Sequence, residues 1–433
     1  MSNIKVTCSA PGKVMIAGGY IVLESQYSGL VIGLDAKGYA TTTTLESRQL
    51  QIHVKSPQFI DAEWHYQLNA ETNPISVNQI SAKDGKPTNC SPNPFVQCAI
   101  FYTVNALFHT ETLKTKWRDL SIVIEMDNAY YNQPELLAGQ TAYPRFNPLR
   151  CKIENVKKTG LGSSAAMITS LTASLYTTMQ TLLSSATEAP KDLDEQTRTL
   201  IHNLSQLAHC SAQGKVGSGF DVAAATYGSC VYRRFDTAII QDLLVTYNDQ
   251  PNDNTFTDRL CKAVNRPWTR VVPFVLPREW KLLMGDIAGG SQTPGMVKKV
   301  LAWKKSNPEQ GKKDFDCLHD QLKTIAACFE TANEGDTEKK LRTAFTTIRK
   351  TLQHITKVAV VDIEPEQQTK ILDAVEQIPG VLGTGVPGAG GFDAQFCICK
   401  NDPSVENAVY SRWRELNVVP MTVGPVDRGL SIE

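Results

Sequence analysis

A glycine loop that runs without a break into a long helical pattern is the feature that most constrains this chain. Residues 158–166 read KTGLGSSAA. Gly160 and Gly162 allow backbone N–H groups to approach an anion closely, and a helix that begins at Ser163 adds its unpaired N–H groups and the positive end of its dipole. The loop therefore predicts a phosphate-binding site. The alternative is a tight turn in which Ser163 is only an N-cap.

The residues after this loop support the helix itself. Apolar residues recur at steps of three and four and define one buried face, at Ile168, Leu171, Leu175, Met179 and Leu182. The loop is not a Walker P-loop, because no Gly-Lys-[Ser/Thr] closes it, and it is not a G-x-G-x-x-G dinucleotide fingerprint. Its adjacent hydroxyls, Ser163 and Ser164, suit either capping of the helix or contact with a phosphate-bound Mg²⁺.

The charge balance limits the partners of the chain. Its 433 residues include 44 Lys and Arg against 44 Asp and Glu, and 42% are hydrophobic. These values describe a soluble globular protein that is long enough for two lobes sharing a cleft. Nucleic acid and anionic membranes are not expected as partners, because they usually require a basic excess or a basic tail. Local groups must therefore hold any anionic ligand.

Cysteine usage and the lack of targeting patterns favour a cytoplasmic protein. The 11 cysteines include no C-x-x-C pair, which indicates reduced thiols. Cys397 and Cys399 lie on one face of an apolar strand, so we expect buried core residues there and not zinc ligands. Residues 11–13, Pro-Gly-Lys, interrupt the apolar stretch that a secretory signal needs, and no run approaches the roughly 18 apolar residues of a membrane span.

Alternating apolar segments predict a mixed α+β fold of two lobes. Strands are expected at 4–7, 39–45, 51–55, 120–126 and 280–285, and helices at 94–108, 194–213, 294–305, 314–333, 338–357 and 366–377. The polar stretch 52–93 is expected to be loop or hairpin decoration, and 241–270 the loop before the second lobe. The resulting boundaries are 1–240 for the N-terminal lobe and 270–433 for the C-terminal lobe.

Three further segments bring chemically active residues next to glycines. Residues 10–20 (APGKVMIAGGY) place Lys13 in a glycine-flanked bend after the first strand, where it either reaches a phosphate or is simply solvated. Residues 217–225 (GSGFDVAAA) place Asp221 at the start of a small apolar helix, as a functional carboxylate or as an N-cap. Residues 383–394 (GTGVPGAGGFDA) are too rich in glycine for a simple turn and suit close approach of the backbone to a ligand.

In this order, the segments resemble the three motifs of the GHMP kinase family, which is named for galactokinase, homoserine kinase, mevalonate kinase and phosphomevalonate kinase. The first motif resembles residues 11–23, the second 160–166 and the third 385–394, so the resemblance covers essentially the whole chain. Within the family, the run 208–228 (AHCSAQGKVGSGFDVAAATYG) and the following VYRRF at 231–235 most resemble fungal-type phosphomevalonate kinases.

The resemblance implies an enzyme that uses ATP and Mg²⁺ to transfer the γ-phosphoryl group to the phosphate of phosphomevalonate, in the mevalonate pathway to isoprenoids and sterols. It implies an N-terminal lobe similar to ribosomal protein S5 domain 2 and a ferredoxin-like C-terminal lobe, with the site between them. Lys13 and Asp221 match the catalytic pair, and Ser164 is the Mg²⁺ contact. The residues expected at ATP are Lys158, Gly160, Leu161, Gly162, Ser163, Ser164 and Ala165, and those expected at the acceptor are Tyr20, Lys215, Ser218, Ser291, Thr293 and Gly390.

The chemistry of phosphoryl transfer limits what these residues must do. The transition state is loose, so the protein mainly positions the reactants and neutralises charge. A phosphate acceptor with a second pKa near ~6 is already largely ionised at pH 7. We therefore expect Asp221 chiefly to orient Lys13 and the acceptor. Lys158 and Lys215 are further candidate cations, and His209 is expected to be a hydrogen-bonded core histidine.

Positions 19 and 20 weigh against two alternatives within the family. Mevalonate kinases and galactokinases carry an acidic residue and a histidine after the glycine of the first motif, whereas this chain has Gly19 and Tyr20. The alternatives that stay open are a mevalonate kinase or another small-molecule kinase of the family, and a non-catalytic ligand sensor. The presence of Lys13, Ser164 and Asp221 argues against the sensor. The sequence does not distinguish a monomer from a homodimer.

Overall fold

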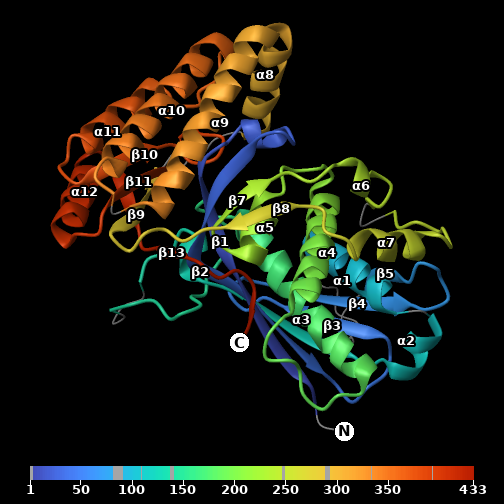
Figure 1. Cartoon of the computed structure of the whole chain (residues 1–433). Helices are drawn as coiled ribbons and strands as arrows, with labels where there is room; N and C mark the ends of the chain where they lie inside the picture. The colour runs from blue at the N-terminus through green and yellow to red at the C-terminus, as the bar shows by residue number, and fades with distance from the viewer. Residues whose placement is uncertain are drawn as a thin grey trace.

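Two β-sheets divide the chain into two lobes (Figure 1). The computed structural model describes residues 3–80, 91–108, 110–136, 141–245, 249–287, 293–332, 334–392 and 394–433. The strands of the first sheet are β1 (Lys5–Ala17), β2 (Ser28–Thr44), β3 (Gln51–Lys55), β4 (Glu63–Asn69), β5 (Ser76–Ile80), β6 (Leu120–Met126), β7 (Cys230–Arg233), β8 (Arg270–Pro273), β13 (Pro425–Val426) and β14 (Ser431–Ile432). The second sheet contains β9 (Trp280–Ile287), β10 (Val381–Gly385), β11 (Ala394–Lys400) and β12 (Val418–Met421).

The long hairpin of β1 and β2 forms the centre of the first sheet, whose main order is β14-β1-β2-β6-β3-β4-β5. β3 runs parallel to β6, and β4 and β5 follow it as an antiparallel meander. Within residues 52–93, the part up to residue 80 therefore forms hairpins, one of the two forms expected, but these hairpins extend the main sheet and are not decoration. The alternation of buried residues at Trp64, Tyr66 and Leu68 is the period-two pattern of a strand.

Helices pack against this sheet around a buried central helix. The helices of the first lobe are α1 (Pro94–Leu107), α2 (Thr110–Lys116), α3 (Ser163–Ser184), α4 (Glu195–Gln213), α5 (Phe220–Tyr227), α6 (Ala238–Gln241) and α7 (Phe256–Val264). α3 begins at Ser163 as predicted. It packs against β1 and β2 on one side and against α1, α4 and α5 on others. The helix is consequently buried around most of its circumference, whereas the sequence predicted one buried face.

The connection between the lobes is more regular than the sequence suggested. Within the stretch 241–270, which was expected to be a loop, α7 forms a helix. Its buried residues recur at the spacing of one helical face, at Phe256, Leu260, Ala263 and Val264. The helix is short and its neighbours along the chain are polar, so a sequence window longer than the helix dilutes this pattern.

The second lobe is an antiparallel sheet with helices packed against it. Its strand order is β10-β11-β9-β12, and its helices are α8 (Thr293–Ser306), α9 (Pro308–Glu330), α10 (Thr337–Ala359), α11 (Glu366–Glu376) and α12 (Pro403–Glu415). Cys397 and Cys399 on β11 are fully buried in a core with Val409 and Trp413. This burial agrees with the predicted role of these cysteines in the core.

The end of the chain returns from the second lobe to the first. β13 pairs with β2, and β14 pairs with β1, so that residues 425–432 complete the first sheet. β8, at the predicted start of the second lobe, pairs with β7 in the same sheet. The boundaries 1–240 and 270–433 stay a prediction. A cut between these two ranges would separate β8, β13 and β14 from the strands of the first lobe with which they pair. In the described part of the chain, every helix is too short or too polar to cross a membrane.

Candidate active site

The predicted phosphate loop ends in a helix terminus that no side chain caps. Gly160 and Gly162 have φ angles of +77° and +84°, in the left-handed region that favours glycine. Gly162 is the N-cap of α3, and no side chain accepts a hydrogen bond from the first turn. A Cβ added to Gly160 would meet nothing within 4 Å. The start of α3 thus has no side-chain cap and the loop is open at Gly160, which is an arrangement suited to anion binding.

Lys13 is fixed against this loop. Its backbone N–H donates to the carbonyl of Leu161 at 2.9 Å, and its ammonium Nζ donates to the carbonyl of Gly160 at 2.9 Å. The sequence placed Lys13 in a bend after the first strand, which was wrong: it lies inside β1. A register shift between Pro11 and Gly12 keeps the strand paired past the proline. The strand therefore positions the lysine more rigidly than a loop would.

Asp221 lies in the first turn of α5. The N-cap of this helix is Gly219, with φ of +87°, so Asp221 is not the N-cap that the sequence left open. One carboxylate oxygen accepts from the Val222 N–H at 3.0 Å, and 24% of the side chain is exposed. The neighbouring Phe220 ring lies under the Lys13 ammonium, with 5.6 Å between Nζ and the ring centroid. The structure therefore brings the strand with Lys13 to the helix that carries Asp221.

His209 on α4 joins the loop to Asp221. Its Nε2 lies 3.1 Å from the Ser164 hydroxyl oxygen and 3.8 Å from the Asp221 carboxylate. The side chain is 3% exposed, and burial lowers its pKa, an effect that Asp221 opposes and Lys215 reinforces. The sequence did anticipate a hydrogen-bonded core histidine but gave it no role in the site. The signal in the sequence for such a role was the position of His209 within the run 208–228, which carries the family resemblance.

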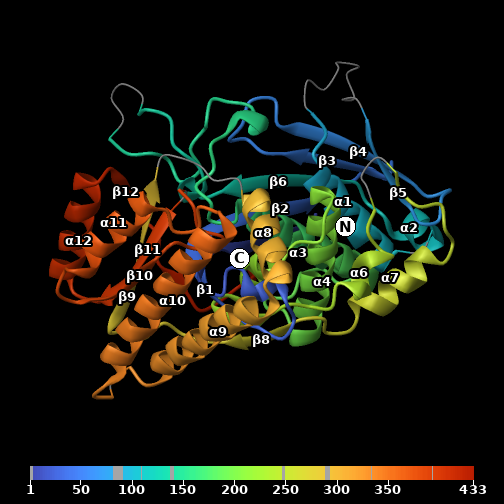
Figure 2. The same ribbon diagram turned by 90° about the horizontal axis from the view of Figure 1, so that it is seen from above.

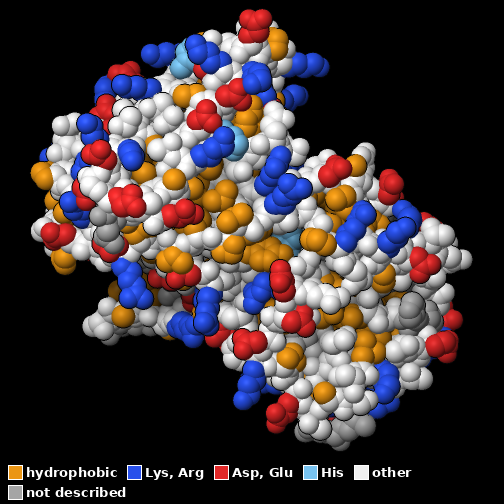
Figure 3. Space-filling model, in the orientation of Figure 1, with side chains coloured by type: hydrophobic (Ala, Val, Ile, Leu, Met, Phe, Trp, Pro, Cys, Tyr) orange, Lys and Arg blue, Asp and Glu red, His pale blue; other side chains and the backbone are white. Residues whose placement is uncertain are grey.

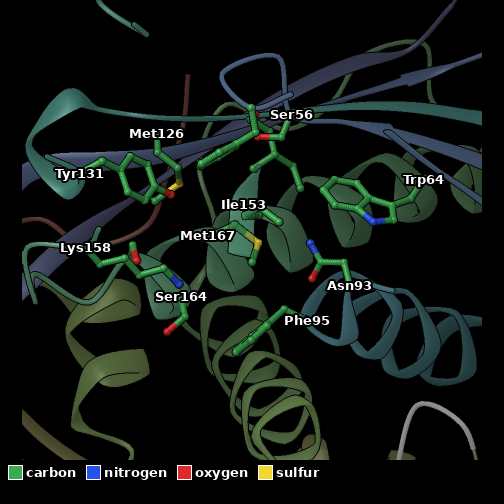
Figure 4. Close-up of a pocket in the computed structure, with 13 residues that line it drawn as sticks. Ser56, Trp64, Asn93, Phe95, Met126, Tyr131, Ile153, Lys158, Ser164 and Met167 are labelled. Carbon is green, nitrogen blue, oxygen red and sulfur yellow. The ribbon is translucent and has the colours of Figure 1, made fainter. Parts of the chain in front are cut away.

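An apolar pocket opens beside the phosphate loop (Figure 4). It has a cavity volume of about 70 Å³ and lies between the sheet, α1 and the start of α3. Trp64, Tyr131, Phe95 and Met167 give it aromatic and apolar walls, with Tyr131 and Trp64 at opposite ends in this view, and Asn93 and Ser164 add polar atoms. The remaining lining residues are Ser56, Phe59, Ile124, Met126, Ile153, Lys158 and Ser163. The pocket suits a flat, mostly apolar group attached to a phosphate.

Lys158 lies where this pocket meets the loop. The lysine is exposed to solvent, yet partial desolvation lowers its pKa. Its backbone forms a bridge with Tyr131, another residue of the pocket wall. Lys158 therefore lines the pocket and is also placed to pair with an anion at the loop.

The two lobes meet at the glycines of the first and third motifs. The Tyr20 hydroxyl, buried at 1% exposure, donates to the Ala389 carbonyl at 2.6 Å. The N–H of Gly388 donates to the carbonyl of Met15 at 3.1 Å. A Cβ on Gly19 would stand only 1.8 Å from the Gly388 carbonyl oxygen. The pair Gly19-Tyr20 thus forms the contact surface for the loop at 386–391.

A half-buried arginine supports the loop before Asp221. The guanidinium of Arg234 on the VYRRF run donates to the carbonyls of Leu23 at 2.9 Å and Gly217 at 2.8 Å. It therefore ties the first motif to the glycine loop that precedes α5. Arg234 was not among the predicted site residues, although the run that contains it carries part of the family resemblance.

Comparison with known proteins places the chain in a family. Residues 339–417 match the family model described as GHMP kinases C terminal. The chain is 40% identical to a phosphomevalonate kinase of Gibberella zeae over 93% of this chain and 90% of that protein. It is 32% identical to the peroxisomal phosphomevalonate kinase of Arabidopsis thaliana over 99% of this chain and 96% of that protein.

The chain belongs to the phosphomevalonate kinases of the GHMP kinase family. A solved structure agrees in fold: the phosphomevalonate kinase of Streptococcus pneumoniae in complex with phosphomevalonate and AMPPNP. It has a TM-score of 0.62 and 16% identity and covers 98% of this chain and 100% of that one. The two-lobed α+β fold predicted from the sequence is confirmed.

The acceptor residues predicted for this phosphomevalonate kinase family member lie in separate places. Lys215 is exposed just after α4, and Ser218 accepts from the Tyr232 hydroxyl at 2.8 Å through its carbonyl. Gly390, with φ of +77°, belongs to the loop at the lobe junction. Ser291 lies outside the described residues, and Thr293 is described only as the first residue of α8. Their contact with an acceptor stays a prediction.

Proposed function

We propose that the chain transfers the γ-phosphoryl group of ATP to the phosphate of phosphomevalonate, giving diphosphomevalonate and ADP. The observation that carries this proposal is the meeting of Lys13, the uncapped start of α3 and the Ser164–His209–Asp221 contacts at one place. Family membership specifies the acceptor. The Streptococcus pneumoniae relative was solved with both phosphomevalonate and a nucleotide analogue, which supports the same substrate pair here.

We assign the nucleotide to the loop and the adjoining pocket. The open space at Gly160 and the unpaired N–H groups of α3 fit the phosphates, since a Cβ at Gly160 would find the space empty. The apolar pocket with Trp64 and Tyr131 fits the base. Lys158, between the two, is placed to neutralise phosphate charge.

Mg²⁺ fits the polar groups at the start of α3. The Ser164 hydroxyl is a hard oxygen ligand of the type Mg²⁺ prefers, and the carboxylate of Asp221 lies nearby through His209. When bound with ATP, the ion neutralises charge on the phosphate oxygens. Of the two residues, Ser164 is the one we propose as a direct ligand.

The residues of the chain position the reactants and balance their charge. Lys13, held by the Gly160 carbonyl, brings a positive charge to the phosphates in a fixed place. The acceptor phosphate is mostly ionised at neutral pH, so it needs little help from a base. Asp221 therefore orients Lys13 and the acceptor, and proton abstraction is secondary.

The substrate specificity has a direct test. ADP release is measured by a coupled assay with phosphomevalonate, mevalonate and galactose as acceptors. Turnover with phosphomevalonate alone supports the proposal. Turnover with mevalonate would reassign the chain to a small-alcohol kinase, and turnover with no acceptor despite nucleotide binding would identify a ligand sensor.

We further propose that the enzyme works in the cytoplasm and supplies isoprenoid and sterol synthesis. The support is its composition: cysteines without C-x-x-C pairs suit a reducing compartment. The name of the Arabidopsis thaliana relative assigns that enzyme to the peroxisome, so the compartment needs its own measurement. Imaging of the full chain with a fluorescent tag at either end would locate it.

A further inference from the structure

Three metal-ligating side chains meet on the outer face of β3 and β4, away from the kinase site. His53 on β3 and His65 on β4 are direct partners in the strand register, and their rings stack with centroids 4.4 Å apart. Glu63 Oε1 lies 2.6 Å from His53 Nε2 and 3.9 Å from His65 Nε2. The three ligand atoms lie within 4.8 Å of one another.

The sheet itself fixes this arrangement. Successive side chains of a strand point to opposite faces, so Glu63 and His65 share the outer face while Trp64 between them points into the apolar pocket. The cross-strand pairing then places His53 beside them. The side chains of His53, His65 and Glu63 are 33%, 20% and 45% exposed, so an ion can reach them from solvent.

We propose that His53, Glu63 and His65 form a binding site for a divalent transition-metal ion, with Zn²⁺ as the best match. Two imidazoles and one carboxylate are the donor set that Zn²⁺ accepts, and they leave a fourth position for water. Mg²⁺ and Ca²⁺ prefer oxygen ligands throughout, so this site is distinct in kind from a site for the magnesium of ATP.

The distances fit this ion. Ligand atoms around a tetrahedral Zn²⁺ stand roughly 3.3 Å apart, given bonds of about 2.0 Å. The 2.6 Å and 3.9 Å separations lie on either side of that value. The rings are stacked almost parallel, so at least one of them must rotate for both nitrogens to face the ion, and their partial exposure leaves room for that rotation. Lys55 is opposite Glu63 in the register, so its positive charge limits the affinity.

Binding to the full chain tests the proposal without any nucleotide. Calorimetric titration with ZnCl₂ is expected to show one ion on this site in the wild type. The double variant His53→Gln/His65→Gln should bind at least roughly tenfold more weakly, because it loses two of three ligands. Equal affinity in the wild type and the double variant would overturn the proposal.

A matched control separates this site from histidines in general. His354 is 44% exposed and lies 3.5 Å from the Asp314 carboxylate, so His354→Gln removes another imidazole beside an acid. This variant should keep the wild-type affinity, and a loss as large as that of the double variant would also contradict the proposal. The cysteines are the same in all three proteins, so any zinc they bind cancels in the comparison.

Thermal stability gives a second measurement. An ion that binds only the folded chain raises its melting temperature with concentration. ZnCl₂ should therefore raise the melting temperature of the wild type and of His354→Gln but not that of the double variant. Melting in EDTA checks that the double variant folds. Neither measurement uses turnover, so the metal proposal stands or falls separately from the proposed kinase activity.

Discussion

The Nε2 atom of His209 lies 3.1 Å from the hydroxyl oxygen of Ser164. The side-chain amide nitrogen of Gln213 lies at the same distance from Nε2, and which of these groups donates depends on the ring tautomer. In the tautomer with the hydrogen on Nδ1, the Nε2 lone pair can accept the Ser164 hydroxyl, whose oxygen lone pairs are then left for a cation. The histidine thus prepares the proposed Mg²⁺ ligand for its role.

Loss of His209 is expected to weaken catalysis through the metal. In His209→Leu, kcat should fall roughly tenfold to a hundredfold, as for other residues that orient a metal ligand. The Mg²⁺ concentration for half-maximal rate should rise, while the KM for phosphomevalonate changes little. His209→Gln, whose amide can accept from Ser164, should recover part of the rate. Steady-state kinetics over a series of Mg²⁺ concentrations measure kcat, the half-maximal Mg²⁺ concentration and the KM in both variants.

His202 provides the control for that experiment. It is another fully buried histidine on α4, two helical turns before His209. His202→Gln should leave the Mg²⁺ dependence unchanged. An equal shift in both variants would mean that any disturbance of α4 has this effect, and the role of His209 would be refuted.

The parts of the site that could be predicted from the sequence are those where the backbone conformation favours one residue type. The left-handed angles at Gly160 and Gly162 require glycine, so the loop could be recognised from its composition. The position of Lys13 inside β1 depends on a register shift, and the role of His209 depends on how α4 packs against α3. Such tertiary contacts leave no local pattern, because a histidine on a helix face looks the same whether it meets a core residue or Ser164.

Asp221→Asn distinguishes an orienting carboxylate from a general base. If Asp221 mainly orients Lys13 and the acceptor, the variant should lose kcat by a similar factor from pH 6 to pH 9. A pH–rate profile with phosphomevalonate measures this factor. Complete loss at pH 6 with recovery at pH 9 would contradict the orienting role.

In Lys13→Met, kcat should fall roughly a hundredfold or more at every pH, because the substitution removes a charge fixed at the phosphates.

The two loop glycines should respond differently to alanine. Both substitutions strain a left-handed residue, at a cost of roughly 1–2 kcal/mol. At Gly160 the added methyl meets open space, so the main effect should be a higher KM for ATP. At Gly162 it would lie 3.0 Å from Lys13 Cγ and 3.1 Å from Cε, so the lysine must move and kcat should fall as well. Equal kcat values in Gly160→Ala and Gly162→Ala would contradict the proposed role of Lys13.

Gly19→Ala should disturb the junction of the lobes. The new methyl would lie 1.8 Å from the Gly388 carbonyl oxygen, so the loop at 386–391 must shift. We expect a loss of stability of roughly 1–3 kcal/mol together with a lower kcat. Gly335→Ala, where a Cβ meets nothing within 4 Å, should stay within about 0.5 kcal/mol of the wild type. Urea unfolding and steady-state kinetics check both, and a neutral Gly19→Ala would disprove the contact.

His202 should make the fold sensitive to acid. Burial lowers its pKa from 6.5 to about 4, and its Nε2 has no hydrogen-bond partner. Between these values the unfolded chain binds a proton that the folded chain does not, so the free energy of unfolding falls as pH falls from about 6.5 to about 4. A shift of that size corresponds to roughly 3 kcal/mol. In His202→Gln this part of the pH dependence should disappear, whereas His354→Gln should retain it. Urea unfolding at pH 7, 5.5 and 4.5 would show the difference, and parallel curves for the wild type and His202→Gln would rule out His202 as the source.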